Sequence, residues 1–274
     1  MRFQRIIDAV YHQPLAISLS GFETIDRILR PAIEGKRPEA DLFGEDMPQM
    51  EIENGVAVIP VIGPLLQHAS LLDKQCGATS YDDIQEDLEA AAARGDVRTV
   101  IFNFDSPGGQ MAGGIELAEF IAEFQRETGI ACYAWSGSQC CSAAYMLAVS
   151  CDQIFCSRTA MIGSIGCIIG FLDTSEAHKM AGLKPNVFTS GKYKGAGYPG
   201  TALTEDQSTN LQSLVDEAFG MFAQHVVAHR PEIEADSMQG QVMFGSVAVA
   251  LGIADENVDT LEELLDFFQP EARD

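Results

Sequence analysis

Residues 99–109 read TVIFNFDSPGG, and this stretch decides the fold. Its first six residues, Thr99–Phe104, are rich in β-branched and aromatic side chains, which favour a strand. The turn-forming residues Asp105–Gly109 end that strand. Apolar residues then recur at helical spacing between Ile115 and Phe124, which predicts an amphipathic helix. A strand, a turn and a helix in this order form the first part of a βαβ unit.

The same alternation continues on both sides of this stretch. Ser80, with Asp83 three residues later, resembles a capping box and predicts a helix that runs to about Arg94. Further strands are expected at 55–62, 132–135, 153–156 and 186–189, further helices at 143–149 and from Thr204 onward, and a loop at 64–80. Strands that alternate with helices predict an α/β fold with a largely parallel sheet.

The first fifty residues read differently from the rest. Phe22, Ile25, Ile28 and Leu29 have helical spacing, and the prolines and glycines between 31 and 48 are typical of a linker. The sequence therefore predicts an N-terminal helical extension and linker over residues 1–50. The main domain is expected to occupy residues 51–274.

Composition excludes several classes of function. Aspartate and glutamate outnumber lysine and arginine by 40 to 17, and this acidic excess argues against a nucleic-acid partner. No run of about 18 apolar residues is present, so no membrane span is expected. The seven cysteines form no CxxC pair, which argues against a zinc site and favours buried, reduced thiols in a cytoplasmic protein. We expect no metal and no other cofactor.

Three segments carry residues that can do chemistry. Adjacent glycines at 108–109 can present backbone N–H groups to an oxyanion, although a tight strand-to-helix turn explains them equally well. Ser142 lies among small residues at the expected start of a helix, where a plain N-cap serine is the alternative. Lys192 and Lys194 lie in a glycine-rich loop, which is also typical of a solvated turn.

Together these segments resemble peptidase family S49, which holds signal peptide peptidases and phage head maturation proteases. The resemblance rests on four motifs in the same order: DSPGG at 105–109, CCSAAY at 140–145, GSIG at 163–166 and GKYK at 191–194. It spans roughly residues 55–265 and implies a crotonase- and Clp-protease-like α/β spiral. Residues 13–17 (QPLAI) resemble the opening of the phage head proteases of this family.

The resemblance also implies a catalytic role for each motif. Ser142 is expected to be the nucleophile, and Lys194, which follows it by 52 residues, the general base of a Ser–Lys dyad. A lysine accepts a proton only when it is neutral, and burial favours that form. The N–H groups of Gly109 and Ala143 are expected to hold the oxyanion, with Gly108 shaping the turn. Ser164 is expected to orient Lys194.

The implied activity is that of a serine endopeptidase, with scaffold or head proteins of a phage or prophage procapsid as substrates. Such a protein is expected to form a homo-oligomeric ring in the host cytoplasm or in the procapsid. A cytoplasmic protease similar to signal peptide peptidases is one alternative. A triad using His178 and Asp173, a Cys141 nucleophile, a crotonase-like acyl-CoA enzyme and an inactive capsid component are the others.

Overall fold

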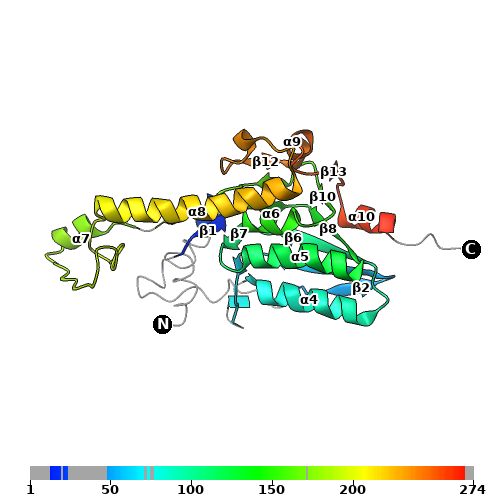
Figure 1. Ribbon diagram of the computed structural model, residues 1–274, viewed down its shortest axis with the longest axis horizontal. Coiled ribbons are helices and arrows are strands. Elements are labelled where there is room, and N and C mark those ends of the chain that lie inside the picture. Colours follow the sequence, from blue (N-terminus) through cyan, green and yellow to red (C-terminus); the bar gives the residue numbers. More distant parts are fainter. Residues whose placement is uncertain are drawn as a thin grey trace, which may run out of the picture.

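The structure is a computed structural model, and it describes residues 13–19, 21–23, 48–70, 73–74, 77–170 and 172–268. A six-stranded sheet with the order β13-β10-β8-β6-β3-β2 forms the centre of the molecule (Figure 1). Neighbouring strands are parallel except for β2, which pairs antiparallel with β3 at one edge. The strands are β2 (Glu51–Glu53), β3 (Val56–Ile62), β6 (Thr99–Asp105), β8 (Ala131–Ser136), β10 (Gln153–Cys156) and β13 (Glu256–Asn257).

Two smaller sheets receive the chain as it leaves the carboxyl ends of the central strands. One has the order β1-β7-β4-β5, with β1 (Leu15–Ile17), β4 (Leu65–Leu66), β5 (Thr79–Ser80) and β7 (Gly108–Gln110). The other has the order β12-β11-β9, with β9 (Gln139–Cys141), β11 (Met161–Gly163) and β12 (Val242–Phe244). The chain passes from β6 into β7, from β8 into β9 and from β10 into β11. The sequence motifs therefore meet at this edge of the central sheet.

Both faces of the central sheet are covered, so its strands are apolar on both sides. Val100, Phe102 and Phe104 of β6 belong to the main core, beneath the helices α4 (Tyr81–Arg94), α5 (Gly114–Thr128) and α6 (Ala143–Ala148). Ile101 points to the opposite face and packs in a second cluster with Leu264 of α10 (Leu261–Phe268). This alternation is the period-two pattern of a strand that is buried on both sides. A shorter helix, α9 (Gly245–Ala250), follows β12.

The longest helix, α8 (Glu205–His229), has 25 residues and therefore spans about 37 Å. Its buried residues, which lie only in its second half, are Ala218, Phe222, His225 and Val226. The first half projects from the body together with α7 (Ser175–Met180), as the left side of Figure 1 shows. We call residues 172–204 the arm. No helix in the described ranges combines the length and hydropathy needed to cross a bilayer.

Most of the predicted elements are confirmed. Ser80 caps α4 by accepting a hydrogen bond from the Asp82 N–H, and Thr204 opens α8 with a complete capping box. The strand predicted at 186–189 is wrong, because these residues lie on the arm, where no described strand pairs with them. The loop predicted at 64–80 contains the short strands β4 and β5.

The expected helical extension over residues 1–50 does not describe Leu15–Ile17, which forms β1 of the main body. Residues 21–23 are helical, as expected from the spacing that begins at Phe22. The remainder of that helix and the linker falls at 24–47, outside the described residues.

Candidate active site

Ser142 lies on a sharp turn between β9 and α6. Its backbone has φ 55° and ψ −116°, a conformation that costs a residue with a Cβ on the order of 1–3 kcal/mol. The surroundings hold this geometry, since the Ser142 N–H donates to the Gly163 carbonyl at 2.7 Å and the Ser142 carbonyl accepts from Met146 at 2.8 Å. The side-chain hydroxyl lies 3.3 Å from the Gly166 carbonyl. A strained serine between a strand and a helix is the geometry of a nucleophile elbow.

The Gly108–Gly109 turn faces Ser142 and the N–H group that follows it. Gly108 has φ +96°, and a Cβ there would lie 2.9 Å from the Ala143 nitrogen. A Cβ on Gly109 would lie 1.9 Å from the Leu65 carbonyl oxygen, because β4 packs directly against β7. Ala143 is the first residue of α6, so its N–H has no partner within the helix. The turn and Ala143 can therefore present donors to one oxyanion.

Ser106 couples the glycine turn to β9, the strand that leads into Ser142. Its N–H donates to Gln139 at 2.9 Å, and its carbonyl accepts from Cys141 at 3.1 Å. Its hydroxyl donates to the Gly63 carbonyl at 2.7 Å and accepts from the Gly108 N–H at 3.2 Å. The sequence pattern marks Ser106 only as a turn residue, and its place in the DSPGG motif is the one local sign of these four contacts.

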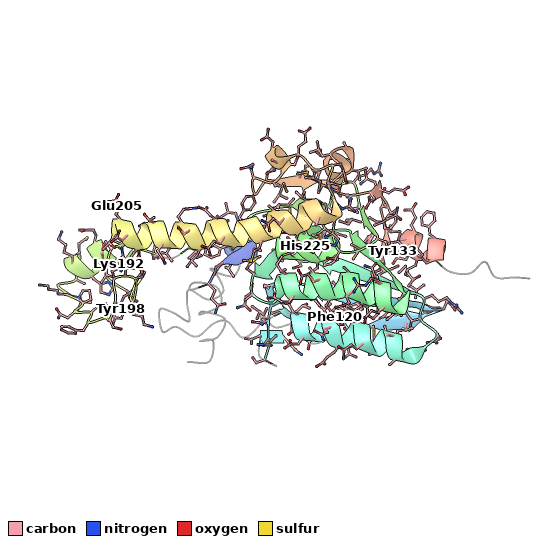
Figure 2. All side chains as sticks on the ribbon, viewed as in Figure 1. Phe120, Tyr133, Lys192, Tyr198, Glu205 and His225 are labelled. Atoms are coloured by element: carbon pink, nitrogen blue, oxygen red, sulfur yellow. The ribbon has the colours of Figure 1, made fainter. Side chains whose placement is uncertain are left out.

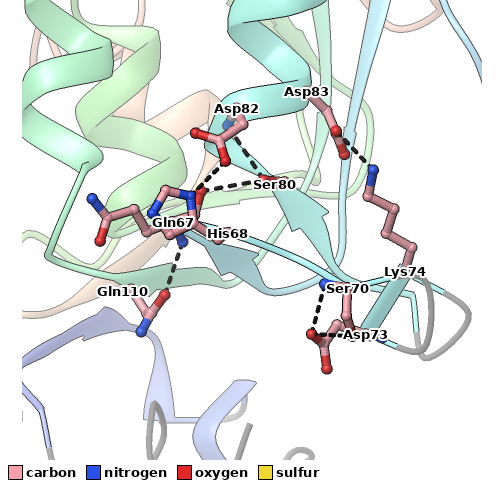
Figure 3. A network of polar contacts seen from close by, with 9 residues as sticks. All are labelled: Gln67, His68, Ser70, Asp73, Lys74, Ser80, Asp82, Asp83 and Gln110. Atoms are coloured by element: carbon pink, nitrogen blue, oxygen red, sulfur yellow. Dashed lines mark hydrogen bonds and ion pairs between the residues drawn. The ribbon is translucent and has the colours of Figure 1, made fainter. Parts of the chain in front are cut away.

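Gln110, the last residue of β7, is held by a polar network, and Figure 3 shows its contact with Gln67. The Gln110 side chain accepts from the Gln67 N–H at 2.8 Å, and the Tyr81 hydroxyl donates to the Gln110 carbonyl at 2.6 Å. Ser80, which caps α4, also donates to the Gln67 carbonyl. The glycine turn is therefore held from the helical layer as well as from Ser106.

Ser164 follows Gly163, whose carbonyl accepts from the Ser142 N–H, and it lines a pocket of about 320 Å³. Like Ser142 it has a positive φ, 54°, and its N–H donates to the Gln241 carbonyl at 2.8 Å. Ile165–Ile168, Ile17 and residues of α8 line the same pocket. The structure therefore brings Ser142, Ala143, Gly108, Gly109 and Ser164 together.

Lys194 is not part of this group within one copy of the chain. It lies exposed on the arm, beside Lys192, whose carbonyl accepts from Gln207 in the first turn of α8. From Gln207 to Ala218, the first buried residue of α8, the helix rises about 16 Å. Figure 2 shows Lys192 and Glu205 at the far end of α8 and His225 over the body.

His178 and Asp173 also lie on the arm and form no triad there. The His178 ring contacts the Thr174 carbonyl at 3.0 Å. Asp173 accepts from the Ser175 N–H at 2.8 Å, which lowers the pKa of its carboxyl. Neither contact joins the histidine to the carboxylate.

The cysteines beside Ser142 are poor nucleophiles. Burial raises the pKa of the Cys141 thiol to about 12, and its sulfur donates to the Met161 carbonyl. Burial also raises the pKa of Cys140. Because the thiolate is the reactive form of cysteine, both groups are inert at neutral pH. Cys76 lies outside the described residues.

The family model of peptidase family S49 matches residues 124–267, more than half of the chain. The head-tail preconnector protein GP5 of Enterobacteria phage P21 is 31% identical, over 78% of this chain and 42% of that protein. Capsid assembly protease C of Escherichia phage lambda is 30% identical, over 78% of this chain and 49% of that protein.

The chain thus spans about half the length of the curated relatives it matches. A crystal structure of an enoyl-CoA hydratase/isomerase family member aligns with a TM-score of 0.45 at 16% identity, over 80% of this chain and 73% of that one. At this score the likeness carries no argument about activity. The family model, with Ser142, Ser164 and Lys194 inside the matched range, shows that the chain belongs to peptidase family S49.

Proposed function

We propose that this chain is a serine endopeptidase in which Ser142 attacks a peptide carbonyl and Lys194 of a neighbouring copy accepts the proton. The observation that carries this proposal is the strained Ser142 turn, with Ala143 and the Gly108–Gly109 turn facing it. These N–H groups would stabilise the negative charge that develops on the carbonyl oxygen. Ser164, in the adjoining pocket, would orient the incoming lysine.

The exposed apolar residues of the arm support assembly with further copies. Met180 is 88% exposed and Phe188 is 95% exposed. On the first half of α8, Leu211 and Leu214 occur at helical spacing, and Leu214 is 42% exposed. Apolar surface of this kind marks an interaction site. A homo-oligomeric ring would cover it and would bring the arm of one copy to the Ser142 of the next.

The test is a mixture of two inactive variants. Ser142→Ala and Lys194→Ala should each abolish cleavage of casein. Co-assembly of the two in equal amounts should restore up to about a quarter of the wild-type activity, since each working site then takes its serine and its lysine from different copies. If the mixture stays inactive while both variants assemble, the lysine acts within its own copy or is not the base.

We infer further that the substrates are scaffold or head proteins of a phage or prophage procapsid, and that the protein acts in the host cytoplasm or the procapsid. The two phage relatives support this inference. Co-expression with such head proteins should yield defined fragments that Ser142→Ala does not produce. Cleavage of detergent-solubilised signal peptides alone would favour the signal-peptide-peptidase-like alternative. Turnover of acyl-CoA without peptide cleavage would favour a crotonase-like enzyme.

A further inference from the structure

The strand β1 lies beside the Ser142 turn, between two other backbone segments. On one side it pairs antiparallel with β7, the strand of the glycine turn. On the other side Leu15 forms an antiparallel bridge with Ile168, with hydrogen bonds of 2.9 and 2.8 Å between the two backbones. Leu15, Ala16 and Ile17 are all buried as a result. An extended segment held by backbone hydrogen bonds is also how proteins bind peptides by β-strand addition.

The register places the Ala16 carbonyl at the oxyanion donors. Ser18 donates to Pro107 at 2.8 Å and Met111 donates to Pro14 at 3.3 Å, so these two pairs are hydrogen-bonded pairs of the ladder. Hydrogen-bonded and non-hydrogen-bonded pairs alternate along an antiparallel ladder. The pair Ala16–Gly109 lies two positions from each of these pairs, so it is hydrogen-bonded as well. The Gly109 N–H therefore faces the Ala16 carbonyl.

A second observation places the same carbonyl next to the nucleophile turn. A Cβ on Gly108 would lie 2.2 Å from the Ala16 carbonyl oxygen and 2.9 Å from the Ala143 nitrogen. The Ala16 carbonyl oxygen and the Ala143 nitrogen therefore lie close to the same point, next to Ser142. The Ile17 side chain, on the other side of the peptide bond, lines the pocket that contains Ser164.

We propose that residues 14–17 are a substrate segment of this chain itself, and that Ser142 cleaves the Ala16–Ile17 bond. This inference rests on the proposed function. The Ser142 hydroxyl oxygen would attack the Ala16 carbonyl carbon and lose its proton to the base. The carbon–nitrogen bond to Ile17 then breaks, the Ile17 nitrogen takes up a proton, and an ester between Ala16 and Ser142 remains. Water hydrolyses that ester, which frees the Ala16 carboxylate and regenerates Ser142.

The experiment reads the new N-terminus by mass spectrometry of tryptic peptides from the assembled full chain. Self-cleavage produces the peptide Ile17–Arg27, whereas an intact chain yields Ile6–Arg27. The wild type should yield the shorter peptide and Ser142→Ala only the longer one. Ala16→Asp should slow the cleavage at least about 100-fold, because a charged side chain in this buried position displaces the carbonyl from the attack geometry. Far-UV circular dichroism of Ala16→Asp reports whether that variant still folds.

A synthetic peptide with the sequence of residues 11–22 provides a test that does not depend on the folding of a variant. The wild type should cut it between Ala16 and Ile17, and cleavage only at another bond would overturn the register. A wild-type protein that digests casein but keeps the Ala16–Ile17 bond, in the chain and in the peptide, would overturn this inference and leave the proposed function standing. If casein, chain and peptide all stay intact, the proposed function itself fails.

Discussion

Replacement of Gly109 by alanine should test the proposed oxyanion role of this turn with little effect on the rest of the fold. The new Cβ would lie 1.9, 2.5 and 2.6 Å from the carbonyl oxygen, the nitrogen and the carbonyl carbon of Leu65. All three are backbone atoms, so no side-chain rotation relieves the contact. Since carbon atoms pack at about 3.5–4.0 Å, β7 must move away from β4 by more than about 1 Å.

That displacement should reduce catalysis far more than stability. A shift of about 1 Å in a positioning group costs about 100-fold in rate, and loss of one oxyanion donor costs about 100- to 1000-fold. We therefore expect kcat/KM for Gly109→Ala to fall by about 100- to 1000-fold. Overpacking of this kind costs about 1–3 kcal/mol of stability, which is a fall in Tm of several degrees for a chain of this size.

The assay is initial-rate cleavage of a fluorogenic peptide, with thermal unfolding followed by circular dichroism. Gly220→Ala is the matched control, because a Cβ there meets no atom within 4 Å and the residue lies in the helix α8. It should keep wild-type activity and gain up to about 1 kcal/mol of stability. Folded Gly109→Ala protein with near-wild-type kcat/KM would refute the placement of the oxyanion donors.

Lys194→Ala should be as inactive as Ser142→Ala, since members of one catalytic unit act non-additively, whereas His178→Ala should retain turnover; the reverse result would favour the triad. Cys141→Ala should keep most of the wild-type activity, and the wild type should resist inactivation by iodoacetamide at pH 7, because its buried Cys141 thiol is protonated there. Burial lowers the pKa of His225 to about 4, below its ordinary value of about 6.5, so the unfolded chain binds the proton first as the pH falls. The free energy of unfolding should then drop between about pH 6.5 and pH 4 in urea titrations, and less steeply in His225→Gln.

Local patterns in the sequence predicted most of the central layer. The β-rich run 99–104, the periodic apolar residues that follow it and the caps at Ser80 and Thr204 each act over a few residues, and each element forms as expected. Ser142, the glycine turn and Ser164 also come together in the structure. Their assembly follows from parallel strands, whose carboxyl ends meet at one edge.

The remaining features depend on contacts between residues that are far apart in the sequence, which local patterns do not reveal. Leu15–Ile17 is too short to show a strand period, and its two partners lie at 108–110 and 168. Asn186–Thr189 has strand-like composition but no described neighbour to pair with. The spacing of Leu211 and Leu214 predicts an apolar helix face, yet it does not say whether the same copy covers that face. The distance in space between Lys194 and Ser142 likewise depends on the path of the chain between them.

The projecting arm has a consequence for the order in which the molecule loses its structure on heating. Segments with exposed backbone and few buried side chains open locally at a small fraction of the global unfolding free energy. Residues 181–204 carry no described strand or helix, and α7 buries none of its residues. Ser142, in contrast, is fully buried on the turn between β9 and α6. Isolated copies should therefore exchange the amide hydrogens of the arm long before those of β6 and β8. Under the proposed function, fraying of the arm would remove Lys194 from the site while the Ser142 turn is still native.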